Sequence, residues 1–218
     1  LTAFSNLNDE HPAKQYLLNR KLPTDYFDRL YYCDKFQTYV NRIRPGTFES
    51  LNKKYEHPRL IIPFYDVDNQ VFAIQGRAFG KEQPKYLTIK LQENKQKIFG
   101  LERINLHKRL YIVEGPLDSL FLDNCLAAGG ADLQLPVDKK DVVFIFDNEP
   151  RNKEIIDRMY KMIEKDYMIV IWPEGQTEKD INEMIINGKT KDQVQKIISD
   201  NTYSGLSAIT QINSYKRC

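Results

Sequence analysis

Three short apolar runs in the second half of the chain constrain its fold more than any other feature. They cover residues 110–113, 142–146 and 168–172, and amphipathic segments with apolar residues three and four apart lie between and after them. Apolar runs this short are typical of strands buried on both faces, and helices between such strands indicate parallel connections. The second half is therefore predicted to be an α/β domain, a parallel sheet with helices on both faces.

Apolar spacing also places the helices expected around this sheet. One helix is predicted after Pro116, a second has its apolar face at residues 155–163, and two closing helices centre on residues 181–185 and 194–198. Trp172 is predicted to lie in the strand core, and no role is assigned to residues 204–218.

The first half follows a different pattern and is predicted to be a smaller α+β domain. A proline after His11 marks the first turn of a short helix. Residues 60–65 and 71–77 form a predicted β-hairpin, and residues 86–91 are predicted to add a third strand. The aromatic-rich stretch 26–39 is not assigned. The two domains are predicted to cover residues 1–108 and 109–218.

Charge is distributed unevenly between the halves. The 218 residues are 41% hydrophobic and carry a net charge of +2, which excludes a disordered chain. Residues 1–110 contain 19 Lys and Arg against 12 Asp and Glu, and residues 111–218 contain 13 against 18. This asymmetry fits a basic half that binds phosphates and an acidic half that gathers carboxylates around a metal; it also fits ordinary solvated charge.

Several classes of protein are excluded by composition. No run of about 18 apolar residues occurs, so no membrane-spanning helix is predicted. Cys33, Cys125 and Cys218 are scattered without a C-x-x-C pair, which fits a reducing cytoplasm and excludes a zinc ribbon within this chain. The sequence opens on Leu1 without a signal segment, so it is predicted to be a fragment of a longer protein.

Carboxylates follow all three predicted strands. Glu114 comes directly after the first strand, Asp147 and Glu149 after the second, and Asp180 after the third. Asp118 is expected one helical turn beyond Glu114, on the same helix face. Ligands bind parallel sheets where the carboxyl ends of the strands meet, and carboxylates gathered there need a cation to offset their repulsion. Oxygen ligands without His or Cys favour Mg²⁺ or Mn²⁺.

Each carboxylate alone also has a purely structural interpretation. Asp180 fits the N-cap of the next helix, Glu114 fits a plain turn before Gly115-Pro116, and Asp118 fits a solvated helix residue. The combination of carboxylates at the ends of separate buried strands favours the metal site.

The motifs around these carboxylates resemble a known family. EGPLD at 114–118 and DNE at 147–149 resemble the Glu-Gly-x-x-Asp and Asp-x-Asp signatures of the Toprim fold, which primases, topoisomerases and some nucleases share. KDINE at 179–183 resembles the later element of primase-type members. In the first half, RLIIP (59–63), QGR (75–77), PKYL (84–87) and IFGL (98–101) follow the order found in the RNA-polymerase core of DnaG-like primases.

The longer strings EGPLDSLF, FDNEPRN and KDINEMI resemble the DNA primases of T-even-type bacteriophages, and the resemblance covers about residues 10–215. It implies a Toprim sheet preceded by a basic α+β subdomain, and RNA primer synthesis on single-stranded DNA from ribonucleoside triphosphates. It further implies Mg²⁺ or Mn²⁺ as cofactor, a replicative ring helicase as partner, and phage DNA replication in the host cytoplasm. Zinc is expected only in a separate N-terminal module that this sequence does not contain.

The resemblance also implies roles for the acidic residues. Asp147, Glu149 and Asp180 are the expected metal ligands, Glu114 is a ligand or general base, and Asp118 supports them. This sequence departs from the family pattern at Glu149, where a second Asp is usual, at Asn152, where Gly is frequent, and at Thr88, where bacterial relatives often have Asn.

Basic residues of the first half are expected to face the triphosphate and the template. Arg77 and Lys85 are the first candidates, although both also fit an exposed charge on a strand edge, and Arg59 and Lys97 come next. Tyr86 fits either a base-stacking residue or a core residue of the small sheet, and the core interpretation is slightly favoured.

Two alternative functions remain at this stage. A Toprim nuclease or topoisomerase would keep the fold but cut DNA, and an inactive Toprim module would bind single-stranded DNA and recruit a helicase. A nuclease would lack the ordered block between Arg59 and Leu101, and an uncompensated acidic cluster would repel DNA.

Overall fold

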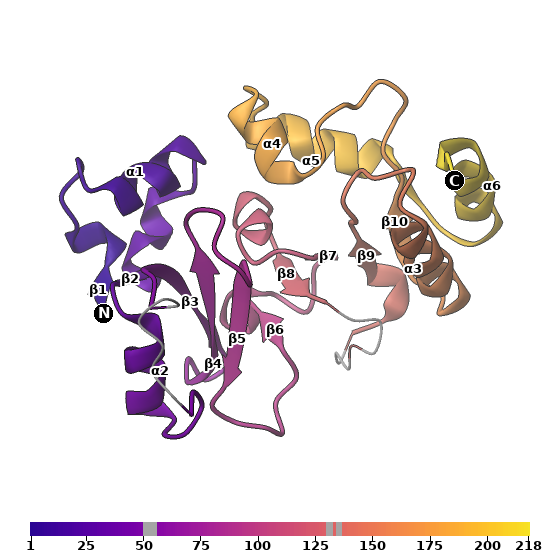
Figure 1. Ribbon diagram of the computed structural model, residues 1–218. Helices are drawn as coiled ribbons and strands as arrows, with labels where there is room; N and C mark the ends of the chain where they lie inside the picture. Colours follow the sequence, from indigo (N-terminus) through magenta and orange to yellow (C-terminus); the bar gives the residue numbers. More distant parts are fainter. Residues whose placement is uncertain (50–55, 130–132, 134–136) are drawn as a thin grey trace. The chain divides into compact units, whose positions relative to one another are not determined.

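The computed structural model describes residues 1–49, 56–129, 133 and 137–218, in two compact units, Leu1–Lys97 and Ile98–Cys218 (Figure 1). The division falls before the expected boundary at residue 108. Strand β6 (Ile98–Phe99) accounts for this difference, because it pairs with strand β8 (Cys125–Ala128) of the second unit.

The first unit is built on an antiparallel sheet. Its strands have the order β1 (Thr2–Ala3), β2 (Tyr31–Cys33), β3 (Arg59–Tyr65), β4 (Val71–Ala78) and β5 (Tyr86–Lys90). The predicted hairpin is confirmed as β3–β4, and the predicted third strand is β5, which pairs with β4. The Asp66 carboxylate accepts the backbone N–H groups of Asp68 and Gln70, which fixes the turn of the hairpin.

Short helices accompany this sheet. Helix α1 (Pro12–Asn19) begins where it was predicted, and the His11 ring caps it by accepting the backbone N–H of Ala13 at 3.1 Å. Helix α2 (Phe36–Ile43) begins within the unassigned aromatic stretch, and its residues Phe36 and Val40 pack under the sheet with Ile61 and Ile74.

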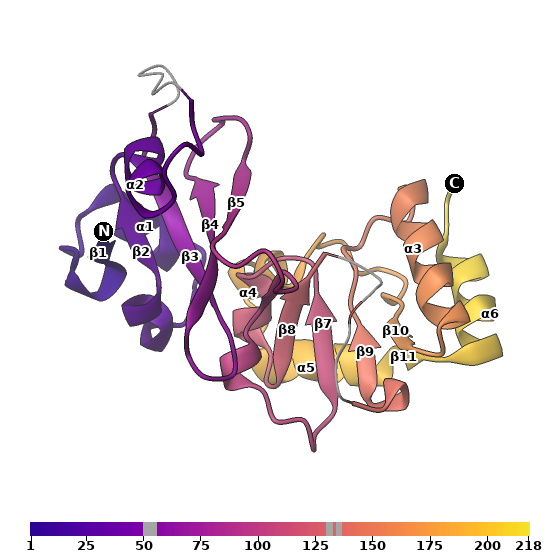
Figure 2. The same ribbon diagram turned by 90° about the horizontal axis from the view of Figure 1, so that it is seen from below.

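The second unit contains the predicted parallel sheet, with the order β11-β10-β9-β7-β8-β6 (Figure 2). Strands β7 (Leu110–Val113), β9 (Val142–Phe144) and β10 (Met168–Val170) are the three predicted runs, and β8 joins them in parallel. The edge strands β6 and β11 (Thr202–Tyr203) are antiparallel. Strands β6, β8 and β11 were not predicted from the sequence.

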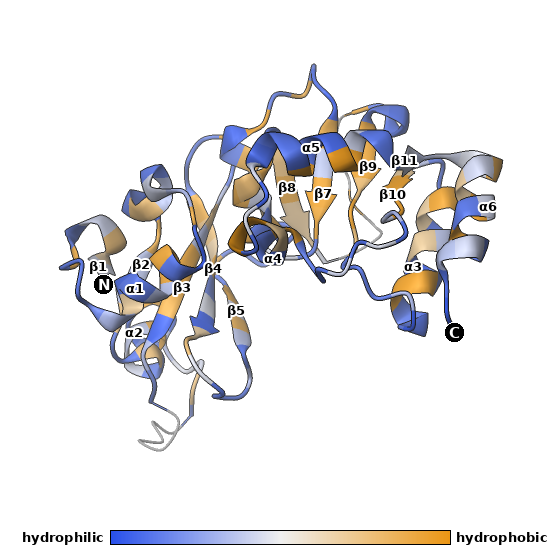
Figure 3. Ribbon diagram, turned by 90° about the horizontal axis from the view of Figure 1, so that it is seen from above, coloured by the Kyte–Doolittle hydropathy of each residue, from blue (hydrophilic) through white to orange (hydrophobic). Residues whose placement is uncertain are grey.

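Helices cover both faces of this sheet. On one face, α3 (Lys153–Glu164) and α6 (Gly205–Tyr215) place Met159 and Ile212 in one buried cluster with Ile112, Phe144 and Ile169. Helix α5 (Lys191–Asp200) runs across the apolar strands on the other side, beside the short α4 (Ile181–Ile186) (Figure 3). The α/β prediction is therefore confirmed, and α6 fills the segment without an assigned role.

One predicted helix is wrong. The segment after Pro116 forms only a 3-10 turn, Asp118–Phe121, because the chain must enter β8 at Cys125 and has room for no more than one turn. The apolar residues Leu117, Leu120 and Phe121 that suggested a helix are nevertheless buried.

Two further observations concern membranes and thiols. In the described part of the chain, no helix is both long and apolar enough to cross a bilayer. Cys33, Cys125 and Cys218 are free thiols, and the first two are buried.

Candidate active site

The carboxyl ends of β7 and β9 bring carboxylates from distant parts of the sequence together. Glu114 directly follows β7, and Asp147 comes three residues after the end of β9. Between β9 and Asp147, the Ile145 N–H donates to the Ile112 carbonyl at 2.8 Å and extends the pairing of β9 with β7. The side chains of Glu114, Asp118, Asp147 and Asp180 line one small cavity. Four of the five predicted carboxylates therefore share one rim of one sheet.

Trp172 forms an apolar wall of the same cavity. It is buried, as predicted, and its indole N–H donates to the Phe146 carbonyl at 2.8 Å. This hydrogen bond fixes the segment that leads from β9 to Asp147.

Asp180 reaches the cavity from the start of α4, and Asp118 reaches it from the 3-10 turn that follows β7. The Asp180 carboxylate caps this helix by accepting the N–H of Glu183 at 2.7 Å, so the N-cap interpretation is correct. Asp118 Oδ1 accepts the N–H of Asn182 at 3.1 Å. The 3-10 turn and the hydrogen bond to α4 therefore bring Asp118 to the same cavity as Glu114. The α-helical turn expected from the sequence does not form.

Glu149 does not line the cavity. Its Oε2 accepts from Asn152 Nδ2 at 2.7 Å, and its Oε1 pairs with the Lys179 ammonium. Lys179 Nζ also lies 3.6 Å from Asp147 Oδ2, so one ammonium contacts both acidic residues of the DNE motif. The hydrogen bond from Lys179 lowers the pKa of Glu149, and the same bond raises the pKa of Lys179.

Arg158 provides a second cation at the rim, which the sequence analysis missed. It lies on α3, its Nη1 is 2.7 Å from Glu114 Oε1, and its guanidinium lies 5.1 Å from the centre of the Phe146 ring. The only sequence signal was a basic residue on the helix that starts just after the DNE motif. This ion pair orients the Glu114 carboxylate.

The rim retains an excess of negative charge despite these two cations. The pKa of Asp147 is raised to about 6, first by burial and then by the Glu114 carboxylate, while Lys179 acts in the opposite direction. A cluster of oxygen donors with excess negative charge fits Mg²⁺ or Mn²⁺ in its chemistry. Across the described residues, however, no three Asp, Glu, His or Cys side chains are already arranged around one metal position.

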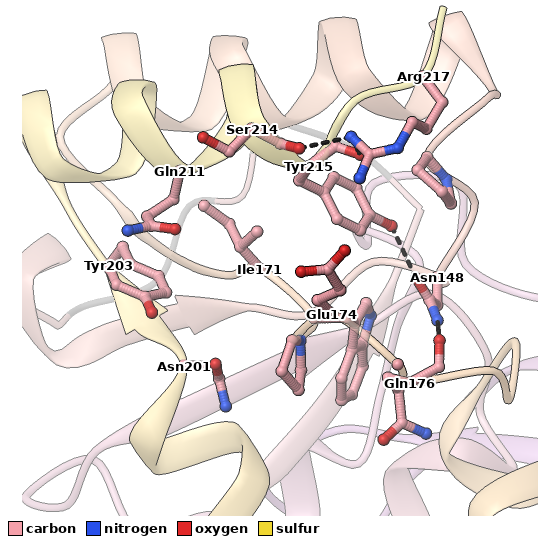
Figure 4. Close-up of a pocket in the computed structure, with 14 residues that line it drawn as sticks. Asn148, Ile171, Glu174, Gln176, Asn201, Tyr203, Gln211, Ser214, Tyr215 and Arg217 are labelled. Carbon is pink, nitrogen blue, oxygen red and sulfur yellow. Dashed lines mark hydrogen bonds between the residues drawn. The ribbon is translucent and has the colours of Figure 1, made fainter.

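Asn148, the middle residue of the DNE motif, ties three segments together. Its Nδ2 donates to the carbonyls of Gln176 at 2.8 Å and Glu178 at 3.1 Å, and its backbone N–H donates to the Lys179 carbonyl at 2.6 Å. The Tyr215 hydroxyl of α6 donates to Asn148 Oδ1 at 3.0 Å, beside a pocket of about 310 Å³ (Figure 4). Burial and the nearby carboxylates raise the pKa of Tyr215. The loop before α4 and the end of α6 therefore hold the motif in place.

In the first unit, Arg59 is buried. Its side chain is 2% exposed, and its Nη1 donates to the carbonyls of Gly76 at 3.1 Å and Pro84 at 3.0 Å. Burial lowers the pKa of Arg59. Its contacts hold the backbone that leads to Lys85.

Arg77, Lys85 and Tyr86 form one cluster on β4 and β5. Arg77 is only 4% exposed, and its guanidinium lies 5.5 Å from the Tyr16 ring and 5.4 Å from the Tyr86 ring. Lys85 is exposed, with its ammonium 5.7 Å from the Tyr86 ring. Tyr86 is 43% exposed, so the preference for a core position was wrong: it begins an edge strand and lies close to two cations. Lys97 is exposed at the end of this unit.

Comparison with known proteins agrees with this architecture. No family model matches the sequence. Over 216 residues the chain is 35% identical to the DNA primase of Enterobacteria phage T4, an alignment that covers 97% of this chain and 62% of that protein. This chain is similar in sequence to a phage DNA primase. It spans about three fifths of the T4 primase.

Solved primase structures share the fold. A DnaG primase catalytic domain bound to single-stranded DNA has a TM-score of 0.65 at 18% identity, over 94% of this chain and 77% of that one. The E. coli primase catalytic core has a TM-score of 0.60 at 18% identity, over 94% and 78%. The zinc-binding and RNA-polymerase domains of Aquifex aeolicus primase have a TM-score of 0.63 at 19% identity, over 89% and 57%. The resemblance to primase catalytic cores that the motifs indicated is thereby confirmed.

Proposed function

We propose that this chain is the catalytic core of a DNA primase that makes short RNA primers on single-stranded DNA by metal-dependent nucleotidyl transfer. The observation that carries the proposal is the shared cavity of Glu114, Asp118, Asp147 and Asp180 in a relative of the T4 primase. By the same relationship, we propose ribonucleoside triphosphates as substrates, a replicative ring helicase as partner, and phage DNA replication in the host cytoplasm as the setting.

In this reaction a primer 3′-hydroxyl attacks the α-phosphate of the incoming nucleotide. A new P–O bond forms, the bond to pyrophosphate breaks, and the hydroxyl proton is removed. Positioning and charge neutralisation carry most of the rate in phosphoryl transfer. A bound Mg²⁺ or Mn²⁺ supplies the neutralisation of triphosphate oxygens and lowers the pKa of the attacking hydroxyl.

The residues of the second unit hold and orient these groups. The proposed metal-holding carboxylates are Asp147, Asp180 and Glu114. Glu149, which pairs with Lys179, is the fourth. Glu114 can also take up the hydroxyl proton, and its pairing with Arg158 fixes the orientation of its carboxylate. Asp118 acts as a positioning residue, because its bond to α4 supports the helix start that carries Asp180.

The first unit supplies the proposed contacts to the nucleotide and the template. Tyr86 is exposed and lies near two cations, an arrangement that suits stacking on the bases of a single strand. Lys85 and Lys97 are exposed and available to phosphates, and Arg77 fixes the Tyr86 ring. Arg59 acts indirectly, by holding the backbone before Lys85.

The proposal is tested with Asp147→Asn in a primer-synthesis assay that contains template, labelled ATP and GTP, and Mg²⁺. Loss of a metal-holding carboxylate should reduce primer yield by at least about 100-fold. Asp200→Asn removes an exposed carboxylate of α5 that pairs with Lys196, and it should leave the yield unchanged.

Full primer yield from Asp147→Asn refutes the assignment. Cleavage of the template by the unmodified protein would favour the nuclease alternative. Salt-dependent binding of single-stranded DNA without any product, across a titration of Mg²⁺ and Mn²⁺, would favour the inactive binding module.

A further inference from the structure

The Lys179 ammonium occupies a specific position at the rim. It pairs with Glu149 Oε1 and lies 3.6 Å from Asp147 Oδ2, so it stands between the two acidic residues of the DNE motif. The lysine side chain is 50% exposed, and those of Asp147 and Glu149 are 31% and 29% exposed. The ammonium is thus accessible to solvent, and it can leave these carboxylates without breaking the fold.

The backbone of Lys179 is fixed independently of its side chain. Its N–H donates to Glu183 Oε2 at 2.6 Å, and its carbonyl accepts the Asn148 N–H at 2.6 Å. Both bonds involve main-chain atoms of Lys179. A substitution of this side chain therefore removes the ammonium and leaves residue 179 beside the motif.

The charge balance of the rim gives this ammonium a role. Asp147 and Glu149 belong to the group of five predicted carboxylates, and Arg158 is a further cation that pairs with this group, through Glu114. A divalent cation needs the same carboxylate oxygens that the ammonium contacts. The Lys179 ammonium and a divalent cation therefore cannot both bind the carboxylates of Asp147 and Glu149 fully at the same time.

We infer that Lys179 is a resident counter-ion that competes with the catalytic divalent cation for Asp147 and Glu149. This inference rests on the proposed function, because it concerns the same metal-holding residues. In the metal-free protein the ammonium offsets the repulsion between the carboxylates. Metal binding then includes release of the ammonium, so the metal affinity is lower than the carboxylates alone would give.

The inference is tested by titrating Mn²⁺ into metal-free protein in a calorimeter. Lys179→Met keeps the length of the side chain and removes the charge, so it should bind Mn²⁺ about 3- to 10-fold more tightly, a modest gain because exposed ion pairs are weak. Lys179→Arg keeps the charge and should bind Mn²⁺ like the unmodified protein. Lys196→Met removes an exposed lysine of α5 and should change nothing.

Melting temperature provides a second measurement. Without metal, Lys179→Met should melt lower than the unmodified protein, and saturating Mn²⁺ should remove this difference. A merely structural lysine would lower the melting temperature equally with and without Mn²⁺.

Unchanged or weaker Mn²⁺ binding by Lys179→Met overturns the inference. If the unmodified protein still binds Mn²⁺ and Asp147→Asn abolishes that binding, only the inference about Lys179 fails and the proposed function stands. If the unmodified protein neither binds Mn²⁺ nor makes primers, the inference and the proposed function fail together.

Discussion

Replacing Asp147 by Asn should stabilise the metal-free protein at alkaline pH. The folded protein raises the pKa of Asp147 from its usual 3.8 to about 6, first by burial and then through the Glu114 carboxylate. The neutral carboxyl is therefore favoured in the folded state, and the stability it contributes is complete below about pH 4. That stability is lost as the pH rises through about 6, because the carboxylate must then ionise in an unfavourable place. Asparagine stays neutral at every pH.

The size of the expected gain in stability follows from the shift in the pKa of Asp147. A change of about two pKa units corresponds to about 3 kcal/mol. The Asp147 side chain is 31% exposed, so solvent screening reduces the expected gain to about 1–2 kcal/mol at pH 8. Near pH 4 the variant and the unmodified protein should be about equally stable.

Urea unfolding in the presence of a chelator measures this difference. Trp172 is the single tryptophan of the chain and lines the same cavity, so its fluorescence reports unfolding of the second unit. Addition of Mg²⁺ should stabilise the unmodified protein and not the variant. A variant that is less stable at pH 8, or a stability difference that does not change between pH 4 and pH 8, would refute the electrostatic reasoning.

Two further predictions concern an aromatic residue in each unit. Tyr86→Ala should weaken binding of single-stranded DNA about 10-fold in fluorescence anisotropy at fixed salt, without loss of stability, because an exposed ring that stacks on a base contributes about 1–3 kcal/mol. The control variant Tyr86→Phe should bind normally. If the alanine variant binds as tightly as the unmodified protein, stacking by Tyr86 is excluded. Tyr215→Phe removes the hydrogen bond to Asn148 and should lower the free energy of unfolding by about 1 kcal/mol and reduce primer yield. An unchanged free energy of unfolding would show that this bond does not hold the motif.

The buried strands were predictable because their apolar runs are continuous. Three runs correspond to β7, β9 and β10, and the rule that parallel strands end at one edge is enough to predict that Glu114 and Asp147 share a rim. Strand β8 escaped prediction because Cys125–Ala128 is short and rich in small residues. The helical spacing after Pro116 was misleading, since three buried apolar residues fit a 3-10 turn as well as a helix.

The cations of the rim could not be predicted from local pattern. Arg158 reaches Glu114 only because α3 packs against the sheet, and Lys179 reaches Asp147 only because the loop before α4 returns to the DNE motif. Tyr86 illustrates the same limit, because period-two alternation places a residue on a face of a strand and does not say whether that face is covered.

The hydrogen bonds of Asn148 set the tolerance of this molecule to insertions and deletions. One amide side chain holds the chain at Gln176, Glu178 and Tyr215, which are far from it in the sequence. A change in the length of either distant segment pulls on the residue between Asp147 and Glu149 and alters the spacing of their carboxylates. Length variation is therefore expected in turns that this amide does not reach, such as the hairpin turn after Asp66.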